Sequence, residues 1–255
     1  MGHVFDTLCA EISMVTVSNP LGRVAEIARG AVLVSGLGTS VRQGDRVLIK
    51  AKLAGEVLTI ASRGALVLTE GPPTGLAIGD EVELLGASTL APDDSWIGRI
   101  VDPYGCPMDG KPLFRGTTSR DVRANAPAAT SRRRMGGRLS TGVAIFDTLL
   151  PLVRGQRIGL FAGSGVGKSS LLAKFARGVD ADVVVIALVG ERGRELREFV
   201  ERVLGPEGMA RSVIVASTSD QSALARRRCA LAAMTVAEHF RAKGLHVLLL
   251  ADSIT

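Results

Sequence analysis

Short apolar runs separated by glycine turns fill the first third of the chain. Between residues 23 and 86 these runs include RVLIK, GEVLTIAS, GALVLTE and GDEVELLG, and Gly-Asp opens two of them after a turn. Short strands punctuated by turns at intervals of about 8–12 residues are typical of a small barrel. The pattern predicts five or six strands at about residues 20–90, and a β-barrel domain over residues 1–90.

After residue 140 the pattern changes to apolar strands that alternate with helices. We expect strands at residues 157–162, 182–189, 212–217 and 246–251, and helices at residues 143–150, 168–177, 195–204 and 222–243. Such alternation predicts right-handed crossovers and a parallel sheet covered on both faces. Residues 141–255 therefore form a predicted α/β nucleotide-binding domain. Residues 91–140, rich in Pro, Gly, Arg and Ala, form a predicted connector.

A glycine-rich turn lies where the first of these strands meets the first helix, in GQRIGLFAGSGVGKSSLL. Gly163, Gly165 and Gly167 lack the Cβ atoms that would keep the backbone from curling with several N–H groups pointing inward. The pattern G-x-x-x-x-G-K-[ST] is met, except that Ala162 replaces its first glycine. The alternative is a glycine-rich turn before an ordinary helix. A Gly-Lys-Ser placed at a strand-to-helix junction favours a phosphate loop.

This loop predicts a nucleoside triphosphate and Mg²⁺ as ligands, and the resemblance described below specifies ATP. The expected nucleotide-binding residues are Ala162, Gly163, Ser164, Gly165, Val166, Gly167, Lys168, Ser169 and Ser170. Lys168 supplies a positive charge for the β and γ phosphates, beside the partial positive charge of the helix N-terminus. The Ser169 hydroxyl is a ligand that suits Mg²⁺.

Two carboxylates follow later strands at the same edge of the predicted sheet. Glu191 can polarise a water for attack on the γ-phosphorus, or it can stabilise the first turn of the following helix, and both roles are compatible. Asp252 comes directly after the apolar run VLLLA, where a carboxylate can hold Mg²⁺ through its water shell. The alternative for Asp252 is a helix N-cap.

Composition indicates a globular protein. Hydrophobic residues make up 46% and aromatic residues 4%, so the core must consist of Val, Leu, Ile and Ala. A mean hydropathy of +0.27 raises the question of a membrane span, but the apolar runs are far shorter than the ~20 residues that a span needs. The N-terminus lacks the basic region of a secretory signal, so we expect a cytoplasmic protein with three free cysteines.

The formal net charge of +6 and a pI near 9.7 could indicate a nucleic-acid or acidic membrane partner. The arginines concentrate at residues 132–134 and 226–228. No aromatic residues interleave with them as base-stacking platforms would require. Solvated faces, or contacts to acidic neighbouring chains, are therefore the favoured interpretation.

Five sequence blocks add a resemblance to these predictions. After the barrel come DPYGCPMDG, TGVAIFD, GQRIGLFAGSGVGKS, VGERGRE and LLLADSIT, and from about residue 20 their order and spacing resemble the rotary-type ATPases. The nearest likeness is to the flagellum-specific ATP synthases, the ATPases of flagellar protein export, followed by the injectisome (type III secretion) ATPases. The resemblance implies a RecA-like P-loop NTPase sheet preceded by a small N-terminal β-barrel.

The resemblance also implies roles and partners. Lys168 and Ser169 would bind nucleotide and magnesium, Glu191 would be the catalytic carboxylate, Arg192 would lie near the phosphates, and Asp252 would be the acid on the magnesium side. Such ATPases form homohexameric rings with nucleotide sites between subunits, peripheral to the inner face of the cytoplasmic membrane. Implied partners are regulator or stator proteins, stalk proteins, the membrane export gate, and export chaperones and substrates, with no specific nucleic acid.

Two other functional classes are alternatives to an export ATPase, and one feature of this sequence argues against each. A nucleic-acid translocase similar to the termination-factor helicases would share the barrel and the RecA-like layout, but residues 20–90 contain no Phe, Tyr or Trp for base stacking. A non-catalytic, nucleotide-holding subunit would be expected to lack an acid at Glu191.

Members of the resembled family continue beyond the position of Thr255, so the sequence is expected to be C-terminally truncated. The continuation would include the arginine that a neighbouring subunit points at the γ-phosphate and the aromatic contacts to adenine. We therefore predict that the 255-residue chain hydrolyses ATP only feebly and forms rings poorly. Phosphate-release assays and size-exclusion chromatography measure both properties, and vigorous cooperative hydrolysis would contradict the prediction.

Overall fold

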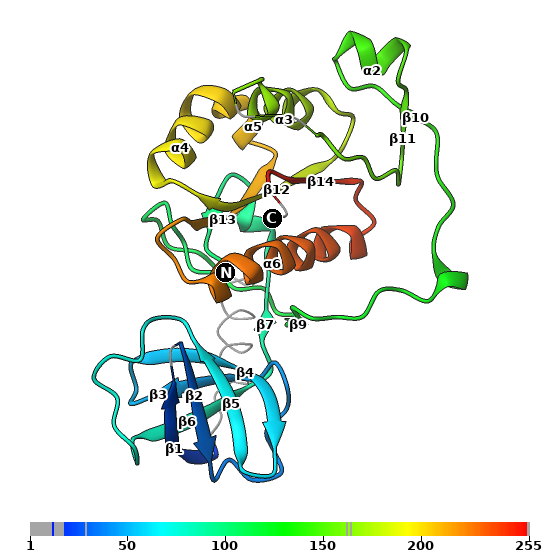
Figure 1. The fold of residues 1–255 in the computed structure, drawn as a ribbon. Coiled ribbons are helices and arrows are strands. Elements are labelled where there is room, and N and C mark those ends of the chain that lie inside the picture. The colour runs from blue at the N-terminus through cyan, green and yellow to red at the C-terminus, as the bar shows by residue number, and fades with distance from the viewer. Residues whose placement is uncertain (1–11, 13–17, 29, 162, 164, 254–255) are drawn as a thin grey trace.

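A computed structural model of the chain describes residues 12, 18–28, 30–161, 163 and 165–253. A barrel at the N-terminal end is followed by an α/β layer that holds a parallel sheet between helices (Figure 1). In the described part of the chain, no helix combines the length and apolar character that crossing a membrane would require.

Six antiparallel strands close into the barrel in the order β1-β2-β5-β4-β3-β6. Their bounds are β1 Leu21–Ala28, β2 Ala31–Ser35, β3 Arg46–Ile49, β4 Leu53–Ala61, β5 Gly64–Thr69 and β6 Glu81–Gly86. Alternate residues point inward, and Val32, Val34 and Val67 are fully buried in the interior. The barrel predicted from the turn spacing is confirmed.

The second sheet is parallel, with strands in the order β14-β12-β13-β8. Its strands are β8 Ile100–Val101, β12 Val183–Glu191, β13 Ser212–Thr218 and β14 Val247–Ala251. At its centre, Ile186 of β12 is aligned with Ile214 of β13 and with Leu250 of β14. Residues 183–188 are all buried, as expected for a strand with neighbours on both sides and layers on both faces.

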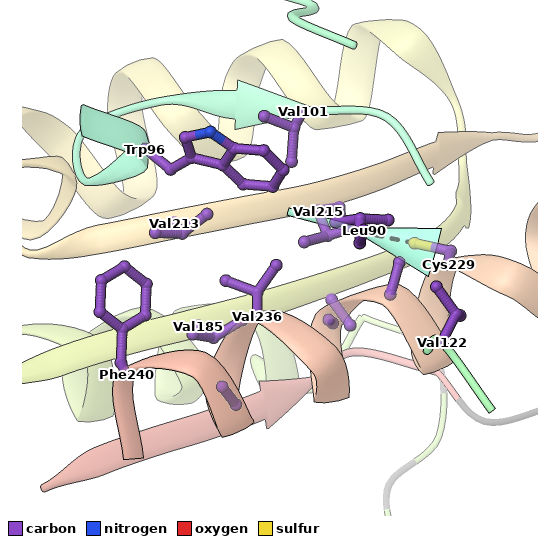
Figure 2. Close-up of a cluster of buried hydrophobic side chains, with 14 of the residues drawn as sticks. Leu90, Trp96, Val101, Val122, Val185, Val213, Val215, Cys229, Val236 and Phe240 are labelled. Carbon is purple, nitrogen blue, oxygen red and sulfur yellow. Dashed lines mark hydrogen bonds between the residues drawn. The ribbon is translucent and has the colours of Figure 1, made fainter. Parts of the chain in front are cut away.

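Helices cover both faces of this sheet. On one face lie α3 Lys168–Gly178, α4 Gly193–Glu198, the π-helical segment η3 Phe199–Leu204, and α5 Gly205–Met209; on the other lies α6 Ala223–Ala242. The even-numbered residues of β12 pack with α3, and the odd-numbered residues pack with α6. Figure 2 shows the α6 side, where Val236 and Phe240 face Val185 and Val213. Burying one such side chain contributes about 1.5–3 kcal/mol.

The segment between the barrel and residue 141 contributes to the second layer. It contains β7 Thr89–Leu90, η1 Asp94–Trp96, β8, β9 Arg120–Asp121, η2 Ala129–Ser131 and β10 Arg138–Leu139. Strand β8 pairs with β13, and Trp96 is 1% exposed in the α6-side core, with its Nε1 donating to the Phe114 carbonyl at 2.7 Å. The domain limits at residues 90 and 140 stay a prediction.

The predicted strand at residues 157–162 is wrong for the residues described there. Residues 157–161 form no strand, and Phe161 is 99% exposed. The outer edge of β14 likewise has no strand partner among the described residues. The apolar run GLF favours an extended backbone, but a strand exists only where a second strand supplies hydrogen bonds, and local pattern does not report that.

The other element predictions differ only in detail. Helix α2 Ala144–Thr148 and strand β11 Leu152–Val153 precede the loop, and α6 and β14 lie within one residue of their predicted limits. The helix predicted at residues 195–204 begins two residues earlier and continues through the π-helical turn of η3 into α5. Strands β12, β13 and β14 run parallel, as predicted, and β8, from the segment predicted as a connector, pairs with β13 in the same direction.

Gly64 gives a test of barrel packing. Its φ is +139°, and a Cβ added there would lie 2.3 Å from the Val34 carbonyl oxygen, so Gly64→Ala should destabilise the chain by about 2–4 kcal/mol. Gly75 has a comparable φ of +83° with nothing within 4 Å, so Gly75→Ala should cost only about 1 kcal/mol. Urea denaturation measures both changes in the free energy of unfolding. Equal losses in the two variants would show that the close approach of Gly64 to the Val34 carbonyl adds nothing to the cost of a Cβ atom.

Candidate active site

The turn before α3 has the backbone of an anion cradle. Gly165 and Gly167 have φ values of 76° and 92°, in the left-handed region that favours glycine. An added Cβ would meet nothing within 4 Å at either position, so the requirement is conformational rather than one of space. Helix α3 begins at Lys168, and its first N–H groups have no partner within the helix. Free amides and the helix dipole together suit a phosphate.

Some of the predicted loop residues lie outside the described residues, namely Ala162 and Ser164. Gly163 and Val166 are exposed, and Ser169 and Ser170 are exposed in the first turn of α3. Their side chains or amides are therefore open to a ligand at the N-terminus of the helix.

Lys168 and Asp252 meet although 84 residues separate them in the sequence. The Lys168 Nζ lies 3.3 Å from Asp252 Oδ1 and donates to the Asp252 carbonyl oxygen at 2.9 Å. Asp252 is 8% exposed, and its amide donates to the Ala187 carbonyl of β12 at 3.0 Å. The phosphate-loop lysine is thus attached to the carboxyl edge of the sheet, where parallel sheets place their ligands.

Glu191 reaches the same edge through a β-bulge. Val189 is aligned with Ser217 and Glu191 with Thr218, which leaves Gly190 as an extra residue in β12. Gly190 has a φ of 75°, and its N–H donates to Ser217 Oγ at 3.3 Å. A bulge redirects the side chain that follows it. No role for Gly190 was predicted from the sequence, although an isolated glycine at the end of a strand pattern is a signal for a bulge.

The two carboxyl groups interact strongly. A hydrogen bond with Asp252, burial, and the nearby Glu195 raise the pKa of Glu191 to about 8. At neutral pH the Glu191 carboxyl is therefore mostly protonated. The Asp252 side chain lies between this carboxyl and the Lys168 ammonium group.

Glu191 directly precedes the N-cap of α4, so the helix-stabilising alternative stays a prediction beside the catalytic role. Helix α4 begins at Gly193, the acid in its first turn is Glu195, and Glu191 lies within β12. Arg192 occupies the N-cap position of α4, with a side chain that is 73% exposed. Its ion pair in the described part of the chain is with Glu195, at 3.4 Å.

The donor set fits a magnesium ion that is held jointly with phosphate. Apart from the ion pair with Lys168, Asp252 Oδ1 is a buried oxygen without a hydrogen-bond partner among the described residues. Nowhere in the described ranges do three or more His, Cys, Asp or Glu side chains form a metal cluster. Mg²⁺ commonly takes one or two protein oxygens with substrate phosphates and water, which Ser169 and Asp252 could supply.

An apolar groove of about 750 Å³ adjoins the loop, and the sequence analysis missed it. Its lining includes Phe146, Leu149, Ile158, Phe161, Val166 and Lys168. Leu149 and Phe161 are 77% and 99% exposed. The groove was not predicted because apolar periodicity in the sequence predicts that such residues are buried. The volume lies in the range of small-molecule sites.

The basic clusters and the cysteines have distinct environments. Arg132, Arg133 and Arg134 are exposed, as the solvated-face interpretation expected, but Arg228 is 3% exposed, so that interpretation is wrong for this residue. Cys106 and Cys229 are free thiols, as predicted, whereas Cys9 lies outside the described residues.

The sequence was compared with family profiles and with known proteins. The profile of the ATP synthase alpha/beta family, nucleotide-binding domain, matches residues 142–255. The chain is 44% identical to the flagellum-specific ATP synthase of Agrobacterium fabrum over 238 residues, covering 92% of this chain and 50% of that protein. It is 40% identical to the type 3 secretion system ATPase of Xanthomonas euvesicatoria, covering 98% of this chain and 57% of that protein.

Structure comparison agrees with these matches. The assembled ATPase EscN of the enteropathogenic Escherichia coli type III secretion system matches with a TM-score of 0.81 and 33% identity, over 90% of this chain and 56% of EscN. EscN in complex with its central stalk EscO matches with a TM-score of 0.82 and 34% identity, over 91% of this chain and 57% of EscN. The fold is therefore a RecA-like sheet preceded by a barrel, and the chain spans about half the length of the curated relatives it matches.

The raised pKa of Glu191 predicts a pH-dependent cost to stability. Between the ordinary pKa of 4.5 and the folded value of about 8, the folded chain holds a proton that the unfolded chain has released, so stability falls as pH rises through this window. Glu191→Gln removes this pH-dependent loss of stability, because the glutamine amide does not ionise. Without nucleotide and in EDTA, the Tm of the variant should exceed that of the parent by more at pH 9 than at pH 5.

Glu198→Gln, which neutralises an exposed acid on α4, is the matched control and should show no such trend. A Tm difference for Glu191→Gln that is the same at both pH values would contradict the protonation assigned to Glu191.

Proposed function

We propose that the chain is a member of the ATP synthase alpha/beta family, whose nucleotide-binding domain profile matches residues 142–255, and that it hydrolyses ATP to energise flagellar type III protein export. The observation that carries this proposal is the convergence of three groups at one sheet edge. Lys168 contacts Asp252, and Asp252 in turn interacts with Glu191. A phosphate loop with a lysine, an acid and a second acid is the set of groups that phosphoryl transfer to water requires.

Each group has a task that its environment supports. The loop amides and Lys168 would hold the β and γ phosphates, and a bound phosphate would compete with Asp252 for the lysine. Magnesium, held by Ser169 and Asp252, would neutralise charge on the phosphates. Glu191 must release its proton before it can polarise the attacking water. Arg192 lies beside Glu191, at the N-cap of α4, and is open to solvent.

The proposed assembly and partners rest on analogy with relatives. EscN is described as assembled and in complex with its central stalk EscO. By analogy, the protein would work as a homohexameric ring at the cytoplasmic face of the membrane. There it would meet regulator or stator and stalk proteins, the export gate, and export chaperones and substrates. The basic charge is then available for acidic neighbouring chains rather than for nucleic acid.

Injectisome secretion is the second candidate. It is supported by the 40% identity to the Xanthomonas ATPase and by the likeness to EscN. Complementation separates the two, because a flagellar ATPase should restore motility to an export-ATPase-deficient flagellated strain. Restored injectisome secretion without motility would favour the alternative.

Two substitutions separate nucleotide binding from turnover. Lys168→Ala should weaken binding of a fluorescent ATP analogue by about 10–100-fold, because it removes the charge that meets the phosphates. Glu191→Gln should leave binding within about twofold and lower single-turnover hydrolysis by at least about 100-fold. Lys174→Ala, at an exposed lysine of α3, is the control and should match the parent.

Hydrolysis by Glu191→Gln at the parental rate would remove Glu191 from the general-base role. Unchanged binding in Lys168→Ala would remove the phosphate loop from nucleotide recognition, and with it the proposed function.

A further inference from the structure

Three side chains from three parts of the chain stack where the barrel meets the α/β layer. The guanidinium of Arg46, at the start of β3, lies 4.8 Å from the centre of the Tyr104 ring. The guanidinium of Arg228, on α6, lies 4.7 Å from the same ring. We call these residues the arginine–tyrosine stack. Each contact is a cation–π interaction, and such contacts strengthen when they are shielded from water.

A tight turn presents Tyr104 between the two arginines. Asp102 Oδ1 accepts hydrogen bonds from the amides of Tyr104 and Cys106, both at 2.8 Å. Gly105 has a φ of 83°, and a Cβ added there would lie 3.1 Å from the Trp96 ring. The sequence DPYGCP, predicted only as part of a connector, is therefore a rigid turn braced against the core of the α/β layer.

Arg228 is held where an unpaired cation would be unfavourable. It is 3% exposed, and its Nε donates to the Pro103 carbonyl at 2.9 Å. Burial and the charge of Arg46 lower its pKa to about 10. Within the described residues, Arg46 Nε has no hydrogen-bond partner, so the face of the tyrosine ring is a principal contact of that guanidinium. The charges of Glu70 and Asp102 favour the Arg228 cation, so nearby acids as well as the aromatic ring offset the repulsion between the two arginines.

Helix α6 extends from this stack to the candidate active site. Arg226, two residues before Arg228, packs over Gly190, where an added Cβ would lie 3.2 Å from the Arg226 Cδ. Cys229, one residue after Arg228, is fully buried, and its Sγ lies 3.3 Å from the Val215 carbonyl and 3.5 Å from the Leu188 carbonyl (Figure 2). One turn of α6 therefore contacts both the barrel-side stack and the bulge that places Glu191.

A second contact joins the barrel to the α/β layer close to the arginine–tyrosine stack. Glu56 of β4 is 6% exposed and forms an ion pair with Arg123, which follows β9. Glu56, Arg123 and Arg228 line one small shared pocket beside α6. The barrel is thus joined to the α/β layer through charged groups whose separation would leave buried charges unpaired.

We propose that the arginine–tyrosine stack is a positioning element that couples the barrel, through α6, to the Gly190–Glu191 bulge. Arg46, Tyr104 and Arg228 touch no substrate and act through α6. The consequence for turnover rests on the proposed ATPase function, whereas the coupling itself is a property of the folded chain. A change at the barrel end of the stack should therefore alter the backbone at the site even when no nucleotide is present.

Amide hydrogen exchange in the nucleotide-free 255-residue chain tests the coupling. The reporters are the Gly190 amide, bonded to Ser217 Oγ, and the Ser219 amide, bonded to the Glu191 carbonyl. Arg46→Met and Tyr104→Leu should each speed exchange at both amides by about tenfold, because each removes a shielded cation–π contact. The Val57 amide, bonded to the Asp45 carbonyl inside the barrel, should exchange at the parental rate.

Matched variants separate the stack from general loss of stability. Tyr104→Phe keeps the ring and should behave as the parent, as should Arg23→Met, which removes an exposed barrel arginine paired with Glu81. The double variant Arg46→Met/Tyr104→Leu should exchange no faster than Tyr104→Leu alone, since that variant already removes the ring that both arginines contact. If Tyr104→Leu fails to fold, Arg46→Met against Arg23→Met decides the question.

Unchanged exchange at Gly190 and Ser219 in folded Arg46→Met would overturn the proposal and leave the stack a local contact. Binding of the fluorescent ATP analogue by the parent tests the proposed function separately. Failure to bind nucleotide with exchange that still responds to Arg46→Met would reject the function and keep the coupling. Normal nucleotide binding, with exchange that does not respond to Arg46→Met, would reject the coupling and keep the proposed function.

Discussion

The contact between Lys168 and Asp252 is the constraint on which the candidate site depends. It joins the first residue of α3 to the end of β14, and the amide of the same aspartate is bonded to β12. The phosphate loop has no strand of its own in the described residues, so this contact fixes the loop to the sheet. The same aspartate also sets the protonation of Glu191. One side chain thereby fixes the position of the loop and raises the pKa of the neighbouring acid.

Much of this arrangement could be predicted from local sequence pattern. The turn spacing indicated the barrel, and the alternation of apolar runs with helices indicated the parallel sheet. The Gly-Lys-Ser junction and the acids that follow two strands indicated which residues meet at one edge, because the carboxyl ends of parallel strands share an edge. These inferences succeed where a short stretch of sequence carries the whole physical cause.

Long-range features were not predictable in the same way. The absence of a strand at residues 157–161 depends on pairing partners, and the burial of Arg228 depends on a ring presented from more than a hundred residues earlier. The bulge at Gly190 had a local signal, but its purpose is visible only once Ser217 and Arg226 are in place. Sequence alone predicts that a charged residue in an arginine run is exposed, and only the structure reveals the residues that cover it.

Strand β8 has a consequence for the order in which the chain can fold during synthesis. The barrel strands are contiguous between residues 21 and 86, so the barrel can close as soon as it leaves the ribosome. Strand β8 must wait for β13, whose last residue is Thr218, and at about 5–20 residues per second the delay is roughly 6–25 s. During that interval Trp96 has no α6 to pack against. Nascent chains that stall between these strands should therefore be strong clients for chaperones that bind exposed aromatic side chains.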